Sequence, residues 1–209
     1  MTDPDLKELL EPIRALTSLF AQSGHPGMIL GGVAAGIWGR SRPTVDVDGM
    51  ILATFADLPD LLQKAGEVGL RPRNPDPIAF AKRNRILLLK HEASGKQVDL
   101  SLGEYPFEVE CVERSKEITV EDVSFPVASP EDLIIYKAVA GRPRDLEDIE
   151  MVLRTQLDLD LNRIEFWAKQ FANGLAIPEI FTTLDALLKK VKGQTKPFVK
   201  KKSRRKSGK

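Results

Sequence analysis

The segment from residue 28 to residue 52 constrains the fold of this chain most, and it reads MILGGVAAGIWGRSRPTVDVDGMIL. Its first apolar run predicts a short buried strand, after which two glycines lead into a helix of small residues. An arginine-rich turn then leads into a second strand that carries Asp46 and Asp48. Because side chains alternate between the two faces of a strand, both carboxylates are expected on one face.

Two unpaired carboxylates held side by side repel each other. A divalent cation between them is the simplest partner, together with a ligand that brings its own phosphates. The alternative is that the pair lies on the solvent face of an edge strand, although the apolar residues around it favour burial. The pair therefore indicates a candidate metal site.

Hydrophobic spacing predicts the elements around this segment. An amphipathic helix is expected over residues 3–22 and another over residues 57–69, whereas the proline-rich residues 71–84 are expected to form a connecting loop. Two strands joined by ASGK, over residues 85–92 and 97–102, are typical of a hairpin. Further short strands are expected at residues 107–112, 117–120 and 123–127.

The pattern becomes helical after residue 128. Ser129 is expected to cap a helix that has Pro130 at its first position and ends at Gly141. Three more helical stretches follow, PRDLEDIEMVL, LNRIEFWAKQFA and IPEIFTTLDALLKKV. The predicted class is α/β (α+β): a mixed sheet with flanking helices over residues 1–127, a helical region over residues 128–192 and a disordered basic tail over residues 193–209.

The charge of the chain is unevenly distributed. Residues 189–209 hold eleven Lys or Arg and no acid, so the rest has 20 basic against 30 acidic residues although the whole chain carries a formal charge of +1. So dense a block of like charge is expected to be solvated and disordered. It can bind RNA or another acidic surface, or it can serve only to keep the protein in solution.

The cysteine and histidine counts exclude some sites. Cys111 is the only cysteine, so no intramolecular disulfide can form and a reducing compartment is expected. His25 and His91 are the only histidines, which excludes a structural zinc site of the usual Cys and His type. Without a signal-peptide pattern or an apolar run long enough for a membrane span, we expect a cytoplasmic protein that does not bind membranes.

A third acid, Asp99, lies between Val98 and Leu100 on the second arm of the hairpin. Gly31-Gly32 after a strand, the acid pair on the next strand and one acid on a later strand together resemble the nucleotidyltransferase superfamily of DNA polymerase β. The run GRSRPTVDVD is similar to the Gly-x-x-Arg-x-Thr-x-Asp-x-Asp run of its toxin-like and uncharacterised branches. SPEDLIIYKAVAGRPRDLEDIEMVL resembles their rear helices, so the resemblance covers residues 28–155.

The resemblance implies an enzyme that transfers a nucleoside monophosphate from a nucleoside triphosphate, such as ATP, to an acceptor. Asp46 and Asp48 would bridge two Mg²⁺ ions, and Asp99 would complete the site nearer the acceptor hydroxyl and take its proton. Glycines let the backbone approach the phosphates, while basic side chains hold the triphosphate tail. The residues implied at the nucleotide are Gly31, Gly32, Arg42, Thr44 and Lys137.

The acceptor stays open between a tRNA end, a protein side chain and a small molecule such as an antibiotic. The basic tail over residues 189–209 favours RNA, because clustered Lys and Arg bind nucleic acid whatever its sequence. The resemblance also suggests a role as the toxin of a toxin–antitoxin pair. The oligomeric state is not predicted.

Two other functions stay open. The family pattern has an apolar residue after the second acid, whereas here it is Gly49, which makes DVDGMIL similar to the opening motif of haloacid dehalogenase-type phosphatases with Asp46 as nucleophile. The turn before Asp46 and the lack of a later paired-acid motif argue against that class. The third possibility is a non-catalytic module of the same fold that binds a nucleotide or RNA.

Overall fold

A mixed sheet runs through the computed structural model, which describes residues 4–40 and 43–194. In this part of the chain seven strands pair in the order β3-β4-β5-β2-β1-β7-β6. They are β1 (Gly27–Ile29), β2 (Asp46–Leu52), β3 (Leu70–Pro72), β4 (Ile86–His91), β5 (Gln97–Gly103), β6 (Lys116–Val120) and β7 (Val123–Val127).

Strand β2 lies at the centre of the sheet. It pairs parallel to β5 on one side and antiparallel to β1 on the other. Strand β1 is parallel to β7, while the remaining neighbours, β3 with β4, β4 with β5 and β6 with β7, are antiparallel. The predicted fold class, with its mixed sheet and the β4–β5 hairpin, is confirmed.

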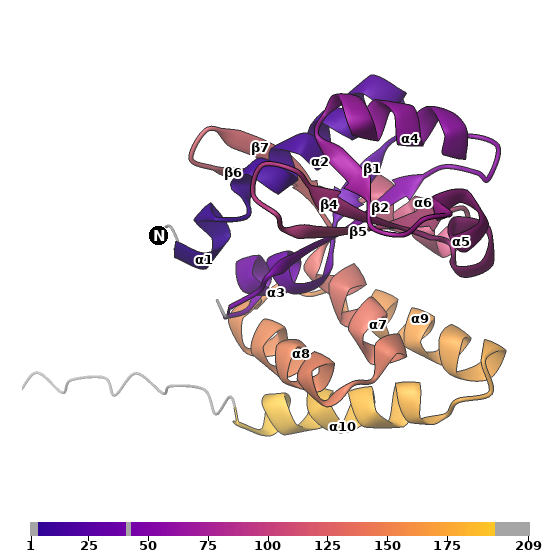
Figure 1. The fold of residues 1–209 in the computed structure, drawn as a ribbon. Helices are drawn as coiled ribbons and strands as arrows, with labels where there is room; N and C mark the ends of the chain where they lie inside the picture. Colours follow the sequence, from indigo (N-terminus) through magenta and orange to yellow (C-terminus); the bar gives the residue numbers. More distant parts are fainter. Residues whose placement is uncertain (1–3, 41–42, 195–209) are drawn as a thin grey trace, which may run out of the picture.

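Helices cover the sheet on both sides (Figure 1). In that view α2 and α4 lie above the strands, while α3 and the helices from α7 to α10 lie below them. The helices are α1 (Pro4–Lys7), α2 (Leu10–Ser23), α3 (Gly31–Trp38), α4 (Leu58–Glu67), α5 (Pro77–Asn84), α6 (Pro106–Glu113), α7 (Pro130–Ala140), α8 (Pro143–Thr155), α9 (Leu161–Gly174) and α10 (Glu179–Gln194).

Three local predictions were wrong. The single helix expected over residues 3–22 is divided into α1 and α2. The loop expected over residues 71–84 contains the end of β3 and the whole of α5, because Pro77 opens a helix and the Asp76 carboxylate caps it by accepting from the Ala79 N–H. The strand expected at residues 107–112 is helix α6, which Pro106 opens and the Glu108 side chain caps.

Close packing against α2 requires a glycine at position 49. A Cβ on this residue would lie 2.7 Å from the Leu16 Cδ2 atom of α2. Val47 and Ile51, two positions away on either side, are fully buried in the same core cluster as Leu16. The glycine after the acid pair therefore allows α2 to lie directly on the central strand.

Buried polar contacts attach the helical half to the rest of the molecule. The carboxylate of Asp132 in α7 is fully buried and accepts from Arg163 Nε of α9 at 2.7 Å, while Arg163 Nη1 donates to Glu110 of α6 at 2.7 Å. The Trp38 indole N–H at the end of α3 donates to the Ala128 carbonyl oxygen at 2.7 Å. These contacts fix α7 beside the sheet.

The predicted domain boundaries stay predictions. All strands of the described part end by Val127, and the helices from α7 to α10 follow. Most of the predicted basic tail, residues 195–209, lies outside the described residues. Among the helices described here, none combines the length and the apolar character that crossing a membrane requires.

Candidate active site

The parallel register of β2 and β5 brings the predicted acids together. Asp48 lies directly opposite Asp99, and Asp46 lies opposite Gln97. Neighbouring strands are about 4.8 Å apart, and directly paired residues of a parallel ladder point to the same face. Asp46, Asp48 and Asp99 therefore share one face at one end of this strand pair.

The start of α3 approaches Asp48 so closely that only glycine fits. Gly31 has a φ of +58°, and a Cβ there would lie 1.7 Å from Asp48 Oδ2. A Cβ on Gly32 would lie 2.4 Å from Thr44 Oγ1, and the Gly32 N–H donates to the Asp48 carboxylate. Thr44 in turn donates to the Asp46 carbonyl oxygen at 3.4 Å.

Burial disfavours the charged form of Asp48 and of Asp99. Burial raises the pKa of Asp48, against the hydrogen bond from Gly32, and the nearby Asp46 raises it further. Burial likewise raises the pKa of Asp99, with Asp48 adding to the effect and Arg73 opposing it. A group of acids that disfavour one another's ionisation provides a binding site for positive charge.

Arg73 was missed by the sequence prediction, which assigned it to a connecting loop without a role. Its guanidinium contacts Asp99 Oδ1 and donates to Gln97 Oε1 at 2.5 Å. The residue follows β3, and its N–H donates to the Leu88 carbonyl oxygen of β4 at 2.8 Å. No motif around Arg73 signalled this contact, because sheet pairing between distant segments creates it.

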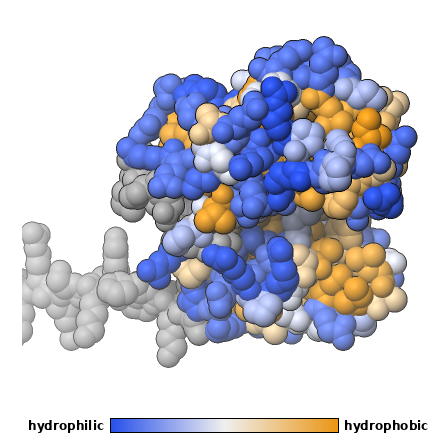
Figure 2. Space-filling model, in the orientation of Figure 1, coloured by the Kyte–Doolittle hydropathy of each residue, from blue (hydrophilic) through white to orange (hydrophobic). Residues whose placement is uncertain are grey.

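Asp48 and Asp99, but not Asp46, line a cavity of about 180 Å³ that residues of α7 also line and that we call the acid cavity. Gly31, Asp48, Asp99 and Lys137 all line it, so four of the predicted site residues meet at one cavity. Figure 2 shows a hollow between the upper and lower halves of the molecule. Arg42 lies outside the described residues.

Lys137 lines this cavity, is buried and already has two acidic partners. Its Nζ lies 2.7 Å from Asp148 Oδ2 and 3.1 Å from Asp145 Oδ1, both on α8, and the residue is 6% exposed. Arg142 also lines the cavity, and its Nε donates to Asp145 Oδ2 at 2.6 Å. Sequence analysis gave no role to Arg142, although the residue lies within the run that resembles the rear helices.

The donor set suits a hard divalent cation, because Mg²⁺ prefers carboxylate oxygens. Over residues 4–40 and 43–194, however, no three His, Cys, Asp or Glu side chains are already grouped to hold a metal ion. The contact between Arg73 and Asp99 explains part of this arrangement, since the guanidinium lies against an oxygen that a metal would use. Binding would exchange one positive charge for another at Asp99.

Replacement of Gly31 with alanine tests the fit between α3 and Asp48. The left-handed backbone should cost Gly31→Ala about 1–2 kcal/mol of unfolding free energy. Displacement of Asp48 by the new Cβ should also lower any metal-dependent activity about 100-fold, the effect expected of a misplacement near 1 Å.

Gly24→Ala is the matched control, because Gly24 has a φ of +72° and nothing within 4 Å of an added Cβ. It should lose similar stability in urea unfolding and keep its activity. Equal activity in the two variants would show that Gly31 serves only the backbone.

Comparison with known proteins identifies relatives of the fold. A family model described as nucleotidyltransferase of unknown function (DUF6036) matches residues 5–174. A search of curated proteins found no match. The suspected membership of the nucleotidyltransferase superfamily is confirmed.

Three solved structures share the fold. An antigenic nucleotidyltransferase-like protein from Paracoccidioides brasiliensis is 16% identical to this chain, with a TM-score of 0.53. The aligned part covers 86% of this chain and 93% of that protein. The antibiotic-resistance factor ANT(2'')-Ia is 14% identical, with coverages of 86% and 98% and a TM-score of 0.56. The nucleotidyltransferase toxin MenT4 of Mycobacterium tuberculosis H37Rv is 15% identical, with coverages of 84% and 68% and a TM-score of 0.50.

Proposed function

This chain belongs to the family of nucleotidyltransferases of unknown function (DUF6036), and we propose on that premise that it transfers a nucleoside monophosphate to an acceptor in a Mg²⁺-dependent reaction. One observation carries the proposal. Asp48 and Asp99 lie in register on neighbouring parallel strands, and the glycines that begin α3 lie directly against Asp48. The family match supports a transferase, and this arrangement supports a metal-assisted one.

Asp46, Asp48 and Asp99 are the residues that would hold two Mg²⁺ ions. When bound, the ions neutralise phosphate charge and stabilise both the attacking and the leaving oxygen. The start of α3 presents backbone N–H groups to the phosphates of the triphosphate. Asp99 takes the proton of the acceptor hydroxyl, a role that suits the carboxylate directly opposite Asp48 on the neighbouring strand.

The transfer step exchanges one phosphoanhydride bond for one ester bond. The acceptor oxygen bonds to the α-phosphorus as its proton passes to Asp99. The bond from the α-phosphorus to the bridging oxygen breaks, and pyrophosphate leaves with that electron pair. The chain therefore needs one nucleoside triphosphate and one acceptor, with no further reactant.

Two basic side chains are available for the triphosphate tail. Lys137 lines the cavity but would have to share its charge with Asp145 and Asp148. The Arg142 side chain is 75% exposed and can turn towards a phosphate more easily. Thr44 and Arg42, from the resembling run, remain proposed contacts of the triphosphate.

The haloacid dehalogenase alternative loses support, since the family match covers the acid pair and residues far beyond it. A toxin-like role, ATP as the preferred triphosphate and RNA binding through residues 189–209 all stay predictions. The same holds for a cytoplasmic location. Support for the toxin-like role is limited to the shared fold of MenT4.

Metal removal tests the proposed reaction. Each of the four nucleoside triphosphates, labelled on its α-phosphate, is incubated with the protein, Mg²⁺ and total cell extract. We expect pyrophosphate release and label transfer to one fraction of the extract. EDTA should abolish both, because the acids cannot neutralise the phosphate charge alone, and excess Mg²⁺ should restore them.

Other outcomes would select the alternatives. Metal-dependent nucleotide binding without pyrophosphate release would favour the non-catalytic module. With the label on the γ-phosphate instead, a labelled acyl-phosphate on Asp46 would favour the phosphatase. Transfer that continues unchanged in EDTA would contradict the metal-dependent reaction.

A further inference from the structure

A second cavity, of about 400 Å³, adjoins the acids and has almost entirely aromatic and apolar walls. It lies between α6, α7 and α9. Tyr136 of α7 lines both this cavity and the acid cavity, so the two share a wall. The residues around the aromatic cavity are Tyr105, Pro106, Phe107, Glu108, Tyr136, Val139, Trp167 and Phe171.

The aromatic rings of this cavity form one packed group. The Phe107 ring centroid lies 4.7 Å from that of Trp167, 5.0 Å from that of Phe171 and 5.2 Å from that of Tyr136. Phe107 itself is buried, which fixes the position of the other rings around it. Rings held by one another offer a rigid apolar wall, and a ligand loses little free energy in ordering it.

Few polar atoms line the walls, and those of Glu108 and Tyr136 already have partners. The Glu108 carboxylate accepts from the N–H groups of Glu104 and Tyr105. The Tyr136 hydroxyl donates to Met50 Sδ at 3.5 Å and is hydrogen-bonded to the Cys111 thiol. A nucleobase or a sugar in this cavity would therefore bury polar edges without partners, whereas an apolar group would not.

An exposed aromatic ring and an ion pair form the mouth of the cavity. Tyr105 is 59% exposed and forms the outer lip, and the Arg85 guanidinium lies 5.0 Å from its ring centroid. Arg85 is paired with the Glu104 carboxylate at 2.9 Å, so these two charges at the lip offset each other. The volume falls within the range of roughly 300–1,000 Å³ that is typical of small-molecule sites.

We propose that the aromatic cavity binds an uncharged apolar group of a small-molecule acceptor, whose hydroxyl then reaches the acids past Tyr136. The inference rests on the proposed function, because an acceptor exists only for a transferase. RNA fits less well, since its bases would carry polar edges into walls that offer few hydrogen-bonding groups. The nucleotide is left to the acid cavity and the start of α3.

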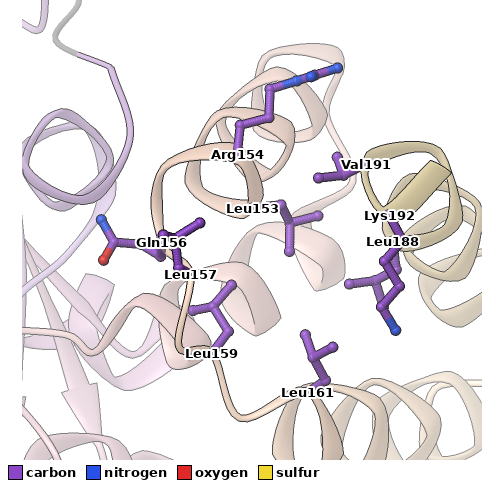
Figure 3. Close-up of a pocket in the computed structure, with 9 residues that line it drawn as sticks. All are labelled: Leu153, Arg154, Gln156, Leu157, Leu159, Leu161, Leu188, Val191 and Lys192. Carbon is purple, nitrogen blue, oxygen red and sulfur yellow. The ribbon is translucent and has the colours of Figure 1, made fainter. Parts of the chain in front are cut away.

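The molecule has another apolar cavity that makes a useful contrast (Figure 3). It measures about 350 Å³ and lies between α8, α9 and α10, where the side chains of Leu153, Leu159 and Leu161 surround it. None of its lining residues also lines the acid cavity. An apolar group bound there would not lie next to the acid cavity, so the rest of its acceptor could not reach the acids.

The experiment uses 2-naphthalenemethanol as an apolar probe with one hydroxyl, and glucosamine as a polar probe. Ligand-observed NMR measures binding of each probe to the full chain with Mg²⁺ and each nucleoside triphosphate, and calorimetry measures triphosphate binding. We expect 2-naphthalenemethanol to bind with a dissociation constant on the order of 1 mM, as its size allows, and glucosamine not to bind.

Trp167→Ala should weaken binding of 2-naphthalenemethanol roughly fivefold and leave triphosphate binding unchanged. Phe166→Ala is the matched control, since Phe166 is the adjacent aromatic residue on α9, is 54% exposed and does not line the cavity. Tyr105→Ala, at the exposed lip, should also weaken the probe and is a second test if Trp167→Ala unfolds.

Four results would overturn the inference: no binding of 2-naphthalenemethanol to the wild-type protein, equal binding by the Trp167 and Phe166 variants, tight glucosamine binding, or competition between 2-naphthalenemethanol and a triphosphate. Competition would assign the cavity to the nucleobase.

Failure of the proposed function is seen separately. If the proposed function fails, the wild-type protein binds no triphosphate and releases no pyrophosphate. If 2-naphthalenemethanol still binds in that case, the cavity is an apolar site but not an acceptor site.

Discussion

Asp48→Asn should lower nucleotidyl transfer roughly 1,000-fold while leaving the metal-free protein as stable as the wild type. Removal of a metal-holding carboxylate costs several kcal/mol of transition-state stabilisation, and about 4 kcal/mol corresponds to this factor. Pyrophosphate release under saturating triphosphate measures the loss. Urea unfolding in EDTA measures the stability of the same protein preparation.

The stability expectation follows from the charge of the site. The asparagine amide has the shape of the carboxylate and can still accept from the Gly32 N–H. It removes a negative charge that burial and the neighbouring Asp46 both disfavour. The unfolding free energy should therefore stay within about 1 kcal/mol of wild type or rise.

Asp60→Asn is the matched control, because the Asp60 side chain is 54% exposed and pairs only one turn away, with Lys64 on the same helix. It should change neither the activation free energy of transfer nor the free energy of unfolding by more than a few tenths of a kcal/mol. An Asp48→Asn protein that retains a tenth of the wild-type rate would exclude Asp48 as a metal-holding residue. A large loss of stability would show instead that the carboxylate serves the fold.

The part of the site that depends on local sequence was predictable. Alternation along one strand places Asp46 and Asp48 on the same face whatever surrounds them, and the glycine pair marks where a backbone must approach closely. Asp99 was recognised as a third acid, but its position opposite Asp48 depends on β5 pairing parallel to β2 across some fifty intervening residues. Periodicity along the chain carries no information about which strands become neighbours.

The contacts of Arg73 and Gly49, which were missed, depend on such long-range neighbours. Arg73 reaches Asp99 because β3 and β4 pair beside β5. Gly49 looked like a departure from the family pattern, yet it is explained by Leu16 of α2, a contact that only the packed structure reveals. The strand expected at residues 107–112 failed because its β-prone residues are equally suitable for a helix once Pro106 and Glu108 cap its start.

Lys137 raises the same problem for function, because its sequence context resembles a phosphate-binding position while its side chain is buried between two acids. Lys137→Met should lower the unfolding free energy by about 3 kcal/mol, because Asp145 and Asp148 both lose the lysine while Asp145 keeps its ion pair with Arg142. Lys169→Met is the control, because the Lys169 side chain is 52% exposed and its Nζ forms a surface ion pair with Glu165 Oε2 at 3.6 Å. It should cost about 0.5 kcal/mol at most.

Replacing Asp145 and Asp148 with asparagine in the Lys137→Met protein separates the two roles of Lys137. The triple variant removes the two buried carboxylate charges together with the lysine that faces them, so it should regain most of the lost stability. If Lys137 also binds the triphosphate, calorimetry should still find the nucleotide affinity of the triple variant lowered about tenfold, the loss of one charge-assisted contact. Recovery of both stability and affinity would make Lys137 a structural link between α7 and α8, and would leave Arg142 as the basic group of this cavity that faces the phosphates.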